Sequence, residues 1–116
     1  MRHETAYLYD ILIASKSVIT FIDGLSEEEF HASGLHQSAV VRQLEIIGEA
    51  TKKISKVFRE AHPEIPWKNM AAMRDILIHA YNTVNIRMVW KVTKEDLPTL
   101  IDLVEKLVSP DGETKV

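Results

Sequence analysis

Apolar residues recur at steps of three and four along most of this chain, which is the spacing of one face of an α-helix. The first stripe predicts a helix over 4–22 that ends at Asp23-Gly24, a turn and helix-stop signal. The positions expected to face the core are Leu8, Ile11, Leu12, Ser15, Val18, Ile19 and Ile22.

A capping box predicts a second, short helix. The Ser26 hydroxyl can accept from the third helical amide, and Glu29 can reach back to the cap amide. This helix should stop before Gly34. Over about 36–60 the chain has no proline, and the pattern predicts one long helix. Its core stripe comprises Val40, Leu44, Ile47, Ala50 or Thr51, Ile54 and Phe58.

Prolines shape the second half of the chain. Pro63 and Pro66 exclude a continuous helix over 62–67, and Pro66 suits the first turn of a helix that runs to about 80 or 81. Asn82-Thr83 should end that helix. A further helix is expected over 86–92, and a last one over about 97–108, with Asp96 as N-cap and Pro98 in the first turn.

Helices of this length joined by short connections pack most simply as a four- to five-helix up-and-down bundle, so we expect an all-α fold. The 116 residues, 46% hydrophobic and 27% charged, are typical of one globular domain rather than of a disordered chain. We expect that domain over 1–109 and a frayed tail over 110–116, where proline and glycine stand among charges.

Charge and cysteine content narrow the function. Fourteen basic and seventeen acidic residues give a net charge of −3, which argues against an overall basic surface but leaves room for a local basic patch. The lack of cysteine excludes disulfides, thiolate metal sites and a cysteine nucleophile. The start of the chain lacks a signal-peptide core, and polar residues 15–17 interrupt its most apolar stretch. We therefore expect a cytoplasmic protein without a membrane partner.

Familiar cofactor and metal motifs are missing. No two of the five histidines lie three or four residues apart, and the sequence has no HExxH motif. The four glycines are never grouped, so a phosphate-binding loop is excluded, and no GxSxG elbow is present. We expect neither a metal site nor a cofactor.

The segment 73–81 concentrates hydrogen-bonding groups in the last two turns of a predicted helix. On a helical wheel with the apolar residues toward the core, Asp75 and His79 lie about 40° apart on the exposed face, while Arg74 lies about 140° from His79. Arg74 of one chain and His79 of the other can meet more easily at the two-fold axis of a homodimer. The helix dipole and Asp75 favour protonated His79, as acid–base chemistry requires. The alternative is that these groups only cap and pack a helix end.

The pattern Arg74-x4-His79-x-Tyr81 resembles the RxxxxHxY motif of the HEPN superfamily, and specifically its HepT-like toxin branch. Three flanking runs are also similar to that branch: residues 43–50, 62–67 and 89–98. The resemblance therefore extends from about residue 40 to residue 107. One variation is Asp75, where many HEPN ribonucleases carry a polar residue that is often asparagine.

The resemblance implies an all-helical homodimer and a metal-independent endoribonuclease. It implies that Arg74 binds the phosphate of RNA and that His79 acts as general base on the 2′-hydroxyl or as general acid on the leaving oxygen, which yields a 2′,3′-cyclic phosphate. In this branch, a type VII-like toxin–antitoxin system, the toxin is paired with a minimal nucleotidyltransferase antitoxin. Tyr81 would then be the residue that receives AMP.

Several further residues are candidates for supporting roles. Glu45 and Glu49, one turn apart, could orient Arg74 or pair with nearby lysines. Arg42 and Lys68 are candidate contacts to the RNA backbone. Trp67 and Trp90 are expected to anchor the core or a dimer interface. Two other functions stay open: a non-catalytic helical subunit that binds a nucleotidyltransferase, and a module that binds a mononucleotide.

Overall fold

The structure of the chain is a computed structural model that describes residues 4–79 and 85–108. Of residues 73 and 75–79 it describes the backbone alone. Within these limits every regular element is helical, and the predicted all-α bundle is confirmed. The predicted tail and the predicted helix end at 80–83 lie outside the described residues.

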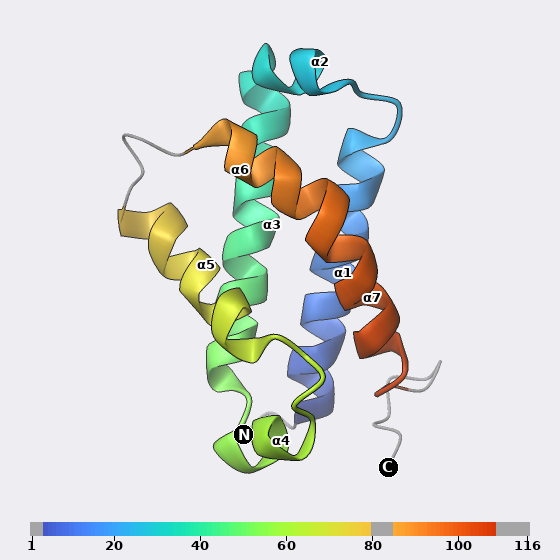
Figure 1. Cartoon of the computed structure of the whole chain (residues 1–116), viewed down its shortest axis with the longest axis vertical. Helices are drawn as coiled ribbons and strands as arrows, with labels where there is room; N and C mark the ends of the chain where they lie inside the picture. Colours follow the sequence, from blue (N-terminus) through green and yellow to red (C-terminus); the bar gives the residue numbers. More distant parts are fainter. Residues whose placement is uncertain (1–3, 80–84, 109–116) are drawn as a thin grey trace.

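Four helices form the body of the bundle (Figure 1). The two long ones, α1 (Glu4–Ile22) and α3 (Gly34–Lys53), lie side by side. Helix α5 (Trp67–His79) packs against α3, and α7 (Leu97–Glu105) packs against α1. The core therefore lies between the α1–α3 pair and the two helices that cover it.

Shorter elements join these four helices. Helix α2 (Glu27–His31) lies at one end of the molecule, and α4 (Lys56–Ala61) lies at the other end, between α3 and α5 (Figure 1). Helix α6 (Ile86–Lys91) and the π-helix η2 (Val92–Asp96) lead into α7. The loop between α4 and α5 carries the two prolines, as the sequence predicts.

Helix α1 has the bounds predicted from the sequence, and it packs against both α3 and α7. By length and composition alone it could cross a membrane. Its apolar stripe is instead buried inside the described bundle, where Ser15 Oγ donates to the Ile11 carbonyl at 2.7 Å and so satisfies a buried hydroxyl. The buried residues of α1 are Leu8, Ile11, Leu12, Ala14, Ser15, Val18 and Ile22.

The single helix predicted over 36–60 is wrong, because the chain breaks it into α3 and α4. Ile54 leaves the helix with φ −74° and ψ 136°, and its side chain is buried in the core. Ser55 then caps α4, since its hydroxyl accepts from the Phe58 amide at 3.1 Å, and the Ser55 amide donates to the Glu4 carboxylate at 3.0 Å. Burial of Ile54 and these two hydrogen bonds replace the lost helical bonds.

The predicted N-cap at Asp96 is also wrong. Asp96 has helical dihedrals, φ −90° and ψ −40°, and makes no capping hydrogen bond, because α6, η2 and α7 run on as one helix. The Leu97 amide donates to the Val92 carbonyl, five residues back. This wider turn accommodates Pro98, which has no amide and whose ring would crowd the carbonyl of an ordinary helical turn.

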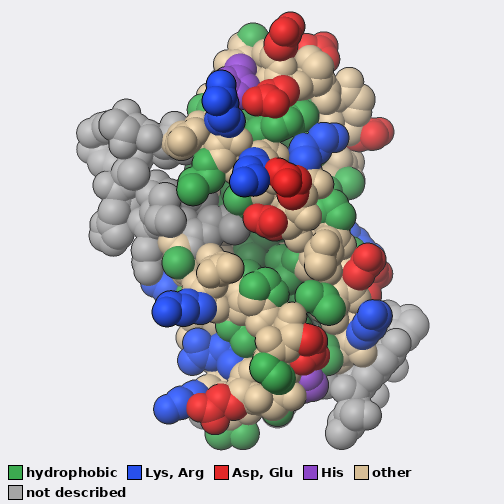
Figure 2. Space-filling model, in the orientation of Figure 1, with side chains coloured by type: hydrophobic (Ala, Val, Ile, Leu, Met, Phe, Trp, Pro, Cys, Tyr) green, Lys and Arg blue, Asp and Glu red, His purple; other side chains and the backbone are tan. Residues whose placement is uncertain are grey.

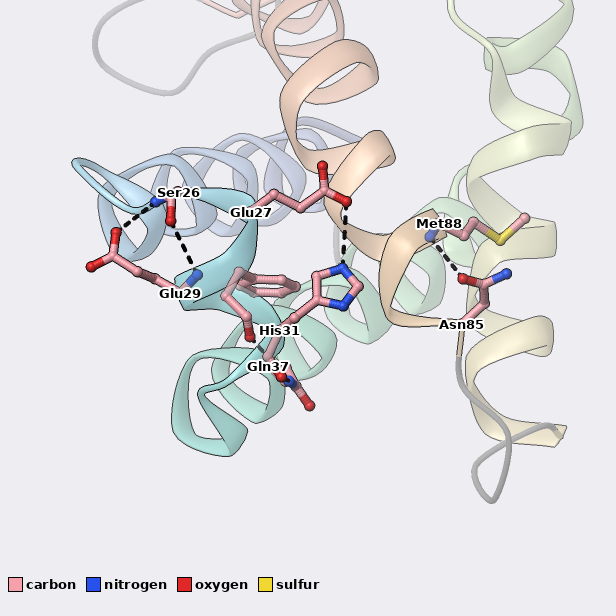
Figure 3. A network of polar contacts seen from close by, with 8 residues as sticks. Ser26, Glu27, Glu29, His31, Gln37, Asn85 and Met88 are labelled. Carbon is pink, nitrogen blue, oxygen red and sulfur yellow. Dashed lines mark hydrogen bonds and ion pairs between the residues drawn. The ribbon is translucent and has the colours of Figure 1, made fainter.

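Polar caps fix the corner where α2 approaches α6 (Figure 3). The predicted capping box is confirmed: the Glu29 amide donates to Ser26 Oγ at 3.1 Å, and the Ser26 amide donates to Glu29 Oε1 at 2.9 Å. These hydrogen bonds from Ser26 lower the pKa of Glu29. Asn85 caps α6 by accepting from the Met88 amide at 3.1 Å. This cap fixes the start of α6.

Candidate active site

The candidate site lies on α5, and the start of this helix is firmly anchored. Trp67 is 7% exposed, and its indole Nε1 donates to the His62 carbonyl at 2.9 Å. Met70, one turn later, is 3% exposed, as expected of its place on the apolar face. The core role predicted for Trp67 is confirmed. Helix α5 thus holds its later residues in a fixed register relative to α3.

Arg74 lies where α5 comes closest to α3. A Cβ added to Gly48 would overlap the Arg74 Cβ and would lie 3.1 Å from the Arg74 Cα. Because Gly48 has no side chain, the two helix backbones can approach each other closely at this point. The Arg74 side chain therefore leaves α5 directly beside α3.

A carboxylate of α3 lies next to this arginine. Arg74 Nε lies 3.9 Å from Glu49 Oε1, and the two side chains are 31% and 42% exposed. The contact confirms the prediction that Glu49 could pair with Arg74. At this distance and exposure the contact is a loose ion pair, and about a third of the Arg74 side chain stays accessible. An accessible guanidinium can bind a phosphate through two parallel N–H donors.

The other predicted carboxylate has a different partner. Glu45 Oε2 lies 3.6 Å from Arg42 Nη1, so these two residues form an i,i+3 pair on α3. Arg42 is 62% exposed, and the pair lies one turn before Glu49. Glu45 and Arg42 thus neutralise each other, whereas Glu49 lies at the candidate arginine.

The backbone of α5 fixes the register of the second motif residue. The helix continues through His79, five positions after Arg74, which places the two positions about 140° apart around the axis and about 7.5 Å apart along it. The wheel geometry predicted from the sequence thus holds for the backbone. The side chains of Asp75 and His79, and all of Tyr81, lie outside the described residues. Their roles remain predictions.

Trp90 has a mixed environment. Its ring lies 5.2 Å from that of Phe30, centroid to centroid, and Lys94 Nζ lies 5.1 Å from its centroid. The ring packs partly buried against the core, in line with the predicted anchoring role.

One enclosed cavity among the described residues lies beside α3, α5 and α7. A pocket of about 330 Å³ lies between α3, α5 and the start of α7, with an apolar floor and three carboxylates, Glu64, Glu95 and Asp96, in its lining. Figure 2 shows this face, with acidic side chains above a hollow. Carboxylates without a lining cation repel phosphate, so this pocket does not suit RNA. Among the described residues, no three His, Asp or Glu side chains are grouped so that they could hold a metal ion.

Two features of the site were not predicted from the sequence. The close approach at Gly48 has one sequence signal, a lone glycine inside a long helical pattern, which often indicates a packing requirement. A wide groove between α4 and α5, lined by Lys56, Arg59 and Lys68, has no local signal, because the break at Ile54-Ser55 creates it. Of these three cations, only Lys68 was a candidate from the sequence.

Comparison with known proteins gives consistent relatives. A protein of Thermococcus cleftensis named "Probable ribonuclease HepT" is 48% identical over 106 residues, which are 91% of this chain and 96% of the relative. A protein of Methanocaldococcus jannaschii named "Putative RNase MJ1380" is 43% identical over 90% of this chain and 95% of its own length. A protein of Caldanaerobacter subterraneus named "Putative RNase TTE0752" is 40% identical over 96% of this chain and 99% of its own length.

No solved structure gives a significant match. The family described as "Ribonuclease HepT-like" matches residues 11–107, which include all of α3, α5 and α7 and the whole 74–81 motif. Because this match covers most of the chain, and relatives at 40–48% identity match nearly end to end, the chain belongs to the HepT-like ribonuclease family.

Proposed function

We propose that this protein is a metal-independent endoribonuclease that cleaves RNA with Arg74 and His79 in the cleft of a homodimer. The observation that carries the proposal is the position of Arg74, held beside Gly48 and Glu49 of α3 with a third of its side chain exposed. Membership of the HepT-like ribonuclease family supports RNA as the substrate. The relatives' names are consistent with this activity.

Arg74 binds the scissile phosphate. Its planar guanidinium stays charged at any relevant pH and can donate to two phosphate oxygens at once. As the phosphorus becomes five-coordinate, negative charge grows on these oxygens, and the fixed cation stabilises it. Glu49 orients the guanidinium before RNA arrives, and it makes only a loose contact that the phosphate can replace.

His79 moves the protons. As general base it takes the proton of a ribose 2′-hydroxyl, and the 2′-oxygen attacks the neighbouring phosphorus. The bond from phosphorus to the 5′-oxygen of the next nucleotide breaks, this oxygen takes a proton from water, and the imidazolium of His79 returns its proton to the solvent. The products are a 2′,3′-cyclic phosphate and a 5′-hydroxyl end. DNA has no 2′-hydroxyl, so it should not be cleaved.

The register of α5 supports the proposed dimer. Positions 74 and 79 of one regular helix diverge by about 140°, so one chain does not direct both at the same atom. A two-fold axis beside this face brings Arg74 of one protomer opposite position 79 of its partner. Asp75, one turn before His79, would support the imidazolium by its charge.

The protein would act as the toxin of a type VII-like toxin–antitoxin pair in the cytoplasm. A nucleotidyltransferase antitoxin would neutralise it by transferring AMP from ATP to the Tyr81 hydroxyl, with release of pyrophosphate. The added phosphodiester would place negative charge two residues after His79, where it competes with RNA for Arg74. Mass spectrometry after incubation with the antitoxin, Mg²⁺ and ATP should detect AMP on the wild type, and Tyr81→Phe should carry none.

Cleavage of cellular RNA in EDTA tests the catalytic roles. The wild type should cleave, while Arg74→Ala and His79→Ala should each lose about 10²- to 10⁴-fold in rate. Circular dichroism checks that both variants keep the helical fold. Full cleavage by either variant, or loss of wild-type cleavage in EDTA, contradicts the proposal.

Mixed dimers test the arrangement across the two-fold axis. Arg74→Ala and His79→Ala chains are inactive separately, but a mixed dimer carries one intact pair if arginine and histidine come from different protomers. Random exchange should therefore restore roughly a quarter of wild-type activity, because half of the dimers are mixed and each has one intact site. No recovery after proven exchange means that both residues act within one chain.

A further inference from the structure

We propose that the groove between α4 and α5 binds the sugar–phosphate backbone of the RNA that the motif cleaves. The groove has a volume of about 730 Å³ and is wide and open. Three cations line it, Lys56 and Arg59 from α4 and Lys68 from the first turn of α5, together with a single carboxylate, Glu60. The inference rests on the proposed ribonuclease function and adds a binding surface outside the catalytic pair.

The charge of this groove is opposite to that of the whole chain. The protein carries a net charge of −3, yet the groove lining carries three positive charges and one negative charge. Figure 2 shows Lys and Arg side chains gathered at the lower left of the molecule, over α4 and the start of α5 as placed in Figure 1. A local positive surface on an acidic protein attracts a polyanion to one place.

Two of these cations have no carboxylate close by. Within 4 Å of Arg59 and Lys68 there is no carboxylate in the described part of the chain, while Lys56 Nζ lies 3.8 Å from Glu60 Oε1. Arg59 Nε is buried without a hydrogen-bond partner among these residues. With no carboxylate close by, Arg59 and Lys68 keep their charge available for a phosphate in the groove.

The floor of the groove suits a backbone rather than a base. Pro63, Ile65, Trp67, Ala71 and Ala72 form it. The Trp67 ring is 93% buried, and its indole N–H is already donated to His62, so it offers no face for base stacking. Two alanines leave a smooth apolar wall for riboses. The groove should therefore bind RNA with little preference for sequence, since phosphate contacts carry no base information.

The register of α5 joins this groove to the catalytic motif. Positions 68, 72, 75 and 79 lie within about 60° of one another around the helix, and positions 68 and 79 lie about 16 Å apart along it. Lys68 and Ala72 line the groove, and position 79 is the candidate base. A strand that follows this face of α5 passes from the groove to the site of cleavage over a few nucleotides.

Neutral, polar variants with shorter side chains test the groove. Lys68→Gln and Arg59→Gln, alone and together, are prepared in a His79→Ala dimer so that RNA is bound but not cleaved. The probe is a fluorescein-labelled single-stranded RNA of about twelve nucleotides, a usual site size for a single-strand groove. Lys91→Gln is the matched control, since Lys91 is an exposed lysine on α6 and does not line the groove.

Anisotropy titrations should show weaker binding by about fivefold or less for each single variant and up to about twentyfold for the double variant. The slope of log K against log salt should become shallower by about 0.7 for each phosphate that a variant no longer neutralises. Lys91→Gln should bind as tightly as the parent. In the wild-type background, the double variant should raise KM and leave kcat unchanged.

Three outcomes separate the two proposals. If the dimer cleaves RNA but the double variant binds it as the parent does, with an unchanged salt slope, the groove proposal is wrong and the groove serves another partner, such as an acidic protein surface. A fall in kcat with unchanged KM also overturns the groove proposal. If the wild type neither binds nor cleaves RNA, the proposed function itself fails.

Discussion

Two sides of α5 each carry a basic residue, but the surroundings of the two residues differ. Toward α3, Arg74 lies against Gly48 and has a carboxylate partner in Glu49. About 120° around the helix, toward α4, Lys68 lies at an open groove without a carboxylate within 4 Å among the described residues. A close backbone contact fixes the direction of one cation, while an open groove leaves the other free to meet a ligand.

This difference indicates a division of tasks. Charge stabilisation in a transition state requires a donor that is held in place before the reaction, because reorganisation during the reaction costs free energy. Attraction of a polyanion requires only charge, and flexible exposed lysines are sufficient for it. Substitutions on the α3 side should therefore lower kcat, and those on the α4 side should raise KM.

The largest effect is expected for Arg74→Lys. A lysine keeps the charge but loses the planar pair of donors, so kcat should fall by about 10²- to 10³-fold, as for loss of one transition-state donor. Steady-state cleavage at saturating RNA measures this change. Lys91→Arg is the control and should cleave like the wild type. A lysine at 74 that leaves kcat within about threefold of wild type would show that charge alone is sufficient.

Gly48→Ala tests the close contact itself. Its Cβ would overlap the Arg74 Cβ, so α5 must shift away from α3, and unfolding should become easier by about 1–3 kcal/mol although alanine favours a helix. Gly34→Ala is the matched control, since nothing lies within 4 Å of its added Cβ. Urea unfolding compares the two variants. Equal stability of both would mean that α3 and α5 can move apart at this point without loss of stability.

Glu49→Gln removes the charge that orients Arg74 and keeps the side-chain size. We expect kcat to fall by about threefold to fivefold, the effect of one partly exposed ion pair, with KM unchanged. Glu105→Gln, which removes the exposed pair with Lys16 at 2.9 Å, should leave cleavage unchanged. Higher activity of Glu49→Gln would show that the carboxylate competes with phosphate instead of positioning the arginine.

The smallest effect is expected at the α2 corner, far from either side of α5. Hydrogen bonds from Ser26 lower the pKa of Glu29 in the folded protein. Its contribution to stability is present above the ordinary pKa of a glutamate and is lost as pH falls through the lowered pKa. Thermal unfolding from neutral to acidic pH should show a weaker dependence on pH for Glu29→Gln. An identical dependence would contradict the capping role of the carboxylate.

Much of the fold could be predicted from the sequence because the signals are local. Helix α1 has the predicted bounds, and the capping box at Ser26 and Glu29 forms as expected. The pattern failed at Ile54-Ser55 and at Asp96. At Ile54 a buried apolar residue is expected both in a continuous helix and at a break, so the pattern cannot distinguish them. At Asp96 a π-turn accommodates Pro98, so the helix does not end there.

For the candidate site, too, some features could be predicted from the sequence and others could not. Spacing along α5 and the family resemblance made Arg74 and His79 candidates, and the backbone register of α5 keeps their predicted divergence. The pairing of Arg74 with Glu49 rather than Glu45 depends on how α5 lies on α3, which one helix cannot specify. The assignment of Lys56 and Arg59 to one groove with Lys68 likewise requires α4 to fold back beside α5.

By itself the sequence determined the helices, their apolar faces and the chemistry that the motif can offer, since each depends on neighbours within a few turns of one helix. Only the tertiary structure decided which carboxylate lies beside the arginine, where two backbones come close enough to require glycine, and where basic side chains gather on an acidic chain. These features depend on distances between segments far apart in the sequence, which are set by the packing of the whole core.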